Sequence, residues 1–153
     1  MKTPKTFIPE KGLEYKVGDL KSQDEYKIRN LMGLILWPDS DEFESCTRLS
    51  DSDLMTRYKL LNPASVEDRI EIKYENIEIH AFKFVDDSLL KENKRNIYSI
   101  IEMVNKKNNY VQANAITKDK YVIFLYTFLG DCDNRNKFIN AYKRKFKFKE
   151  LKQ

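Results

Sequence analysis

Two segments in the first half of the chain place apolar residues at the three- and four-residue spacing of an amphipathic helix. Ser22 with Glu25, and Ser50 with Asp53, form capping boxes in front of these segments. In such a box the serine oxygen accepts a backbone amide, while the acid reaches back to the amide of the cap. The pattern predicts two helices, the first over Gln23–Leu36 and a shorter second one that ends before Asn62.

The spacing changes to two residues after the second predicted helix. From Arg69 to Ala81 apolar and charged positions alternate, and only Glu75 and Asn76, which suit a tight turn, interrupt the alternation. This pattern predicts a β-hairpin with one face in the core and the other face in water.

A long helix and a second hairpin are predicted next. Residues 86–88 are good cap residues, and an apolar stripe follows from Leu90 to Val104. The hairpin comprises Tyr110–Thr117 and Lys120–Phe128. Its second strand is apolar on both faces, so we expect this strand to be covered on both sides and central in its sheet.

The chain ends in a predicted amphipathic helix. Asp133 or Asn134 caps it, and the cationic segment Arg135–Lys152 forms it. Its apolar stripe consists of Phe138, Ile139, Tyr142 and Phe146.

The order of these elements predicts the fold class. Helix, helix, hairpin, helix, hairpin, helix, with no internal repeat, is typical of an α+β domain. We expect a single domain over residues 22–153, in which an antiparallel sheet of about four or five strands packs with about four helices. Prolines and glycines break up residues 1–21, so we expect an extended N-terminal arm, with a short edge strand around Tyr15.

Size and composition fit this picture. The chain has 153 residues, enough for one domain with a sizeable core, and 34% are charged, above the roughly 25% of an average domain. No stretch approaches the roughly 20 apolar residues of a membrane span, and the N-terminus has no apolar signal core. We therefore expect a cytoplasmic protein, or an extracytoplasmic one whose signal peptide has been removed.

The candidate chemistry is sparse. His80 is the only histidine, and in the middle of a strand it favours a structural role over a catalytic triad. The calcium-like spacing of Asp131, Asp133 and Asn136 lacks the glycine and the glutamate that a calcium loop requires. The glycines are too scattered for a phosphate-binding loop. We expect no catalytic residue, metal site or cofactor, although an enzyme centred on His80 stays open.

The acidic stretch and the two cysteines are each compatible with more than one structure. The acidic stretch Asp39–Glu44 is predicted to be a solvated loop. Cys46 and Cys132 have neither zinc nor redox spacing, so two buried thiols are favoured, while a disulfide would require an oxidising compartment.

The charge is concentrated at the C-terminal end. Residues 135–152 hold eight of the 28 Lys and Arg residues and one of the 24 Asp and Glu residues, a net +7 against −3 for the rest. Such a cluster attracts anionic surfaces whatever the total charge of the molecule. The candidate binding residues on this face are Arg135, Lys137, Lys143, Arg144, Lys145, Lys147 and Lys149.

Three functions are compatible with this face. The sequence favours a non-catalytic interaction module, such as an inhibitor or a bacterial toxin-neutralising immunity protein, that binds an acidic surface of a partner protein. The alternative is a nucleic-acid-binding protein, in which Phe146 and Phe148 would stack on bases between the cations. In the third interpretation the cationic face of the helix is only solvated and binds no partner. The sequence does not determine the oligomeric state.

Overall fold

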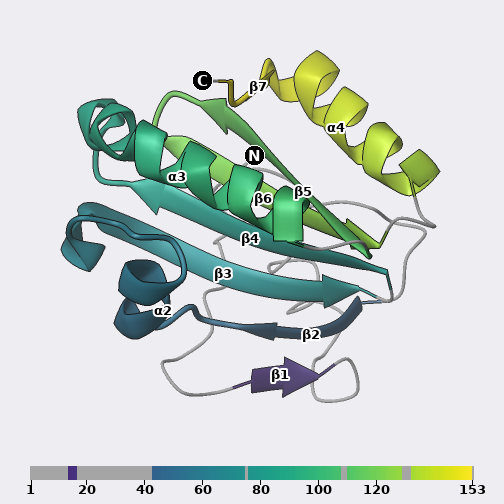
Figure 1. Ribbon diagram of the computed structural model, residues 1–153, viewed down its shortest axis with the longest axis horizontal. Coiled ribbons are helices and arrows are strands. Elements are labelled where there is room, and N and C mark those ends of the chain that lie inside the picture. The colour runs from purple at the N-terminus through teal and green to yellow at the C-terminus, as the bar shows by residue number, and fades with distance from the viewer. Residues whose placement is uncertain (1–13, 17–42, 75, 108–109, 129–131, 153) are drawn as a thin grey trace, which may run out of the picture.

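The computed structural model describes residues 14–16, 43–74, 76–107, 110–128 and 132–152. They form an antiparallel sheet with helices packed on it, which confirms the predicted α+β class (Figure 1). The strands follow the order β1-β2-β3-β4-β6-β5-β7. Five of them are five or more residues long: β2 (Phe43–Thr47), β3 (Val66–Tyr74), β4 (Ile77–Phe84), β5 (Val111–Lys118) and β6 (Tyr121–Phe128). The short strands β1 (Glu14–Lys16) and β7 (Lys149–Glu150) lie at the two edges.

Three α-helices and one short 3-10 helix lie within the described residues. They are α2 (Asp51–Thr56), the 3-10 helix η3 (Pro63–Ser65), α3 (Asp87–Lys107) and α4 (Cys132–Phe146). Helix α3 crosses one face of the sheet, and α4 lies along the side of β5 and β7 (Figure 1). The predicted helix Gln23–Leu36 falls outside the described residues. No described helix combines the length and hydropathy that crossing a lipid bilayer requires.

The two predicted hairpins are present and adjacent. Strand β3 pairs with β4, and β5 pairs with β6. Strand β6 also pairs with β4, so it lies inside the sheet as its two apolar faces predict. On the α3 side, Phe82, Phe84, Val122 and Phe124 pack against Ile97 and the neighbouring apolar residues of the helix. This core determines which face of the sheet α3 covers, and the two candidate functional sites lie on that same face.

The second predicted helix is shorter than expected. Ser50 and Asp53 form the predicted capping box, with Ser50 Oγ 3.0 Å from the amide nitrogen of Asp53. Helix α2 nevertheless ends at Thr56 rather than before Asn62. Lys59 adopts a left-handed backbone conformation with φ of 54°, which turns the chain so that Leu60, and not Leu61, enters the core.

The prediction that Asp39–Glu44 is a loop was wrong for its last two residues. Residues 43–47 form β2, which pairs with β3 and places Thr47 opposite Glu71. Strand pairing is made by backbone groups, so a polar segment next to a long strand joins the sheet without an apolar pattern of its own. The earlier part of the stretch falls outside the described residues.

The C-terminal element differs most from its prediction. Helix α4 ends at Phe146, because Lys147 has a φ of 63° and leaves the helical conformation. The chain then returns to the sheet, where β7 pairs with β5 through Thr117 and Lys149. The turn buries Phe148, which is 2% exposed, where a straight helix over 135–152 would point it elsewhere.

Besides its apolar packing, helix α3 is hydrogen-bonded to β5 through the side chain of Asn105. The Asn105 amide nitrogen donates to the carbonyl oxygen of Ala113 at 3.0 Å, and its oxygen accepts from the amide of Ala113 at 2.7 Å. These bonds satisfy backbone groups of β5 at a position that β7 does not pair. They therefore hold the helix at a fixed position across the sheet.

The capping box of α2 gives a test of this arrangement. We expect Ser50→Ala to lower the free energy of unfolding by about 1 kcal/mol, because the N-terminal amides of the helix lose their acceptor. The measurement is urea denaturation followed by circular dichroism. The control is Ser52→Ala, the same change at the exposed second residue of the helix. Equal losses in the two variants would contradict the role of the cap.

Candidate functional site

A cationic hollow lies between α3, the β5–β6 turn and the C-terminal segment. Its volume is about 460 Å³. We call it the lysine pocket. It is lined by Asp87, Leu90, Lys91, Lys94, Thr117, Lys118, Asp119, Lys147, Lys149 and Leu151.

A second hollow continues the first along α3. It shares Lys91 and Lys94 with the lysine pocket and adds Arg95, Tyr98 and Lys152. Seven cationic side chains therefore surround the two hollows, against the two carboxylates of the lysine pocket. Among the described lining residues the carboxylates are too few to neutralise the cations, so these residues together give a positive local potential.

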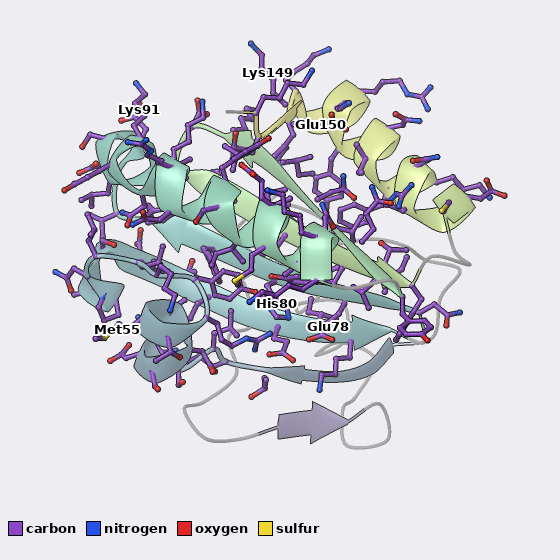
Figure 2. The ribbon with its side chains drawn as sticks, viewed as in Figure 1. Met55, Glu78, His80, Lys91, Lys149 and Glu150 are labelled. Atoms are coloured by element: carbon purple, nitrogen blue, oxygen red, sulfur yellow. The ribbon has the colours of Figure 1, made fainter. Side chains whose placement is uncertain are left out.

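None of these seven cations forms an ion pair with another described residue. The described ion pairs lie elsewhere, and on the C-terminal segment Lys143 takes Glu150 as its partner, with 3.3 Å between Nζ and Oε1. Figure 2 shows Lys91 on α3 and Lys149 on β7 projecting outward at the same side of the molecule. The fold thus gathers positive charge from three separate segments of the chain.

The predicted cationic face is divided by the structure. Lys147 and Lys149 line the lysine pocket, which they reach because the chain leaves α4 at Phe146. Lys137 and Arg144 are exposed on α4, and Lys143 is paired.

The remaining two members of that face are Arg135 and Lys145. Arg135 donates a hydrogen bond through Nη1 to the side-chain oxygen of Gln112, so part of its side chain is held against β5. The side chain of Lys145 lies outside what the structure describes. The sequence missed the α3 contribution, Lys91, Lys94 and Arg95, because these cations are scattered along a helix in the sequence and meet the C-terminal segment only in the fold.

A buried polar cluster occupies the other end of the same face of the sheet. His80 on β4 is fully buried, and the register places it opposite Glu71 on β3. Its Nε2 atom lies 2.8 Å from Oε1 of Glu78 and 3.9 Å from Oε2 of Glu71. Figure 2 shows His80 and Glu78 close together in front of the sheet, well away from Lys149.

Two tyrosines complete this cluster on the other side of the imidazole ring. The hydroxyl of Tyr58, just after α2, is hydrogen-bonded to Nδ1 of His80. The same hydroxyl lies 2.9 Å from the hydroxyl of Tyr126 on β6. Both nitrogens of the ring therefore have partners, and the ring of Tyr126 lies 4.8 Å from that of His80.

Burial and hydrogen bonding set the protonation states. Burial lowers the pKa of His80, so the imidazole is neutral at pH 7. The hydrogen bond from His80 lowers the pKa of Glu78 to about 2, whereas burial and then the nearby Glu78 raise the pKa of Glu71 to about 7. Burial raises the pKa of Tyr126 to about 12 and that of Tyr58 well above its usual value.

These states give the hydrogen bonds a direction. Ionised Glu78 can only accept, so Nε2 of His80 carries the proton and donates it. Nδ1 then accepts from Tyr58, and Tyr58 accepts from Tyr126. The chain of donors runs from Tyr126 to Glu78 through a neutral histidine.

Two cations lie beside the carboxylate of Glu71. Nη1 of Arg57 lies 3.7 Å from Oε2 of Glu71, and Nζ of Lys73 lies 3.6 Å from its Oε1. The side chains of both cations are nearly half exposed, so they screen Glu71 from the solvent side. The charged face of the first hairpin is therefore covered at Arg69, Glu71 and His80 and partly open at Lys73 and Glu78. The prediction that this face lies in water was wrong for the buried part, where Tyr58 packs over His80.

Comparison with known protein families, with characterised proteins and with solved structures finds no match to this chain. The two sites must be interpreted from their own chemistry. The lysine pocket can hold anions of a partner in an open hollow. The His80 cluster offers one nitrogen and two carboxylates at the surface end of a buried hydrogen-bond chain.

The lowered pKa of Glu78 predicts a specific dependence of stability on pH. A carboxylate whose folded-state pKa lies below its unfolded value of 4.5 stabilises the fold above that value, and this contribution is lost as the pH falls towards 2. We expect Glu78→Gln to lower the free energy of unfolding at about pH 6, and the difference from the wild type to shrink towards about pH 3.

Urea denaturation across this pH range measures the difference directly. The control is Glu67→Gln, which removes a half-exposed carboxylate that lies 3.8 Å from Lys83 on the same pair of strands. A wild-type to Glu78→Gln difference that stays constant with pH would show that the hydrogen bond to His80 does not hold the carboxylate ionised.

Proposed function

We propose that this chain is a non-catalytic interaction module, of the inhibitor or immunity type, that binds an acidic segment of a partner protein through the lysine pocket. The observation that carries the proposal is the convergence of seven cations, unpaired among the described residues, on two connected hollows. Such a surface attracts an oppositely charged partner over a distance of about one Debye length, roughly 8–10 Å, and speeds association.

The shape of the pocket supports a protein partner. A hollow of about 460 Å³ with Leu90 and Leu151 among its lining residues offers apolar contact beneath the lysines. An acidic loop or helix end can place carboxylates against the rim and an aliphatic side chain inside. Positive rims of this kind contribute more to association rate and specificity than to affinity.

The nucleic-acid alternative loses part of its support. It requires aromatic side chains that stack on exposed bases between phosphate contacts. Phe148 is 2% exposed and packs against Tyr142, with 5.5 Å between the ring centroids, so it is not available as a stacking surface. The side chain of Phe146, the other predicted stacking residue, lies outside what the structure describes.

Replacing four pocket lysines tests the proposal. We expect Lys91→Gln, Lys94→Gln, Lys118→Gln and Lys149→Gln, combined in one variant, to weaken binding of a labelled oligoglutamate peptide about fourfold or more, since each lost pair is worth about 0.2–1 kcal/mol. Fluorescence anisotropy at low and high salt measures the affinity of each variant for the peptide. The matched control removes four cations outside the pocket, at Lys106, Lys107, Lys137 and Arg144.

Each outcome of this experiment decides between the alternatives. Loss of peptide binding in the pocket variant alone supports the proposal. Equal loss in both variants shows that charge acts without a site, which contradicts it. Tighter binding of a labelled single-stranded oligonucleotide than of the peptide, lost in the pocket variant, supports the nucleic-acid alternative instead.

A further inference from the structure

The side chains of Glu71, Glu78 and His80 form a donor set with the composition and spacing of a metal site. One ligand atom from each of the three lies within 4.8 Å of the others. In a tetrahedral site with bonds of about 2.0–2.2 Å, neighbouring ligand atoms are about 3.4 Å apart. The two distances from Nε2 of His80 to the carboxylates, 2.8 and 3.9 Å, bracket this value. Small rotations of the glutamate side chains would therefore bring all three atoms to one ion.

We propose that Glu71, Glu78 and His80 bind one divalent transition-metal ion of the Zn²⁺ type. An imidazole nitrogen favours Zn²⁺ and related ions over Mg²⁺ and Ca²⁺, which prefer oxygen ligands alone. Three protein ligands leave the fourth position of a tetrahedral ion for water. The inference is separate from the proposed function, since none of these residues lines the lysine pocket.

The two tyrosines suit the site because they hold the imidazole in either tautomer. An ion on Nε2 requires the proton of the neutral ring to be on Nδ1. The hydroxyl of Tyr58 then accepts from Nδ1 and donates to Tyr126, which reverses both hydrogen bonds without moving a heavy atom. The proton of Nε2 passes to solvent by way of Glu78. Tyr58 passes its proton to Nδ1, and the half-buried Tyr126 passes one to Tyr58 and regains one from solvent, so the ring and both hydroxyls stay neutral.

The approach to the site is open at one ligand and closed at the others. The side chain of Glu78 is 35% exposed, whereas those of Glu71 and His80 are 10% and 0% exposed. An ion would therefore enter past Glu78. Arg57 and Lys73 balance the carboxylates when no ion is bound, and their half-exposed side chains leave them free to turn towards water when an ion replaces their charge.

Titration of the metal-free protein with ZnCl₂ alone, by isothermal calorimetry, tests this site. We expect one equivalent to bind and to raise the melting temperature, while MgCl₂ does not raise it. Loss of a group that only hydrogen-bonds to a metal ligand costs about 10- to 100-fold in affinity. His80→Gln and Glu78→Gln remove proposed ligands themselves, so we expect each to weaken Zn²⁺ binding by at least about 100-fold. Glu67→Gln, on the same strands and outside the donor set, should bind as the wild type does.

The use of two variants keeps the test valid if one of them does not fold. If His80→Gln does not fold, which circular dichroism will show, Glu78→Gln alone decides, because its side chain is partly exposed. Failure of the wild type to bind Zn²⁺ overturns the proposal. Wild-type affinity in Glu78→Gln overturns it as well, because the ion would then be held elsewhere, for example by the acidic stretch Asp39–Glu44.

Discussion

The register of β3 against β4 is the constraint on which the buried part of this structure depends. A connection of two residues, 75 and 76, joins the strands, and the pairs from Lys73–Glu78 to Asp68–Lys83 follow from it, before the register shifts at Val66. Glu71 stands opposite His80 and Lys73 opposite Glu78, all on one face. A slip by one residue would turn these polar side chains to the other face and bring Ile70 and Ile72 to this one. The hairpin thus decides whether there is a polar cluster at all.

Burial then gives that cluster its chemistry. Tyr58 covers His80 from the end of α2, and its ring also contacts Phe82 and Phe124 of the core. Polar groups excluded from water need partners, and here each nitrogen of the imidazole has one. The surroundings separate two carboxylates that are equivalent in a peptide: the hydrogen bond from His80 lowers the pKa of Glu78 to about 2, while burial raises the pKa of Glu71 to about 7. Environment, and not residue type, assigns their roles.

The lysine pocket, unlike the buried cluster, is exposed to solvent. Its cations remain in water, where keeping like charges close costs little, and the apolar residues below them are shared with the core, as Leu90 and Leu151 are. The return of the chain after Lys147 makes this possible, because β7 brings Lys149 beside the end of β5 and next to the first half of α3. One face of the sheet therefore carries an exposed cationic region at one end and a buried, nearly neutral polar cluster at the other.

Periodicity alone determined the α+β class, both hairpins, the central position of β6, the cap of α2 and helix α3, because local spacing encodes which face of an element is apolar. The hairpin pattern around residues 75 and 76 also contained the pairing of Glu71 with His80, although the charged positions were interpreted as a wet face. Only the tertiary structure decided that Tyr58 covers this face, that α4 stops at Phe146 and that α3 supplies lysines to the C-terminal cations. These outcomes depend on contacts between segments far apart in the chain, and the free energy of those contacts has no local signature in the sequence.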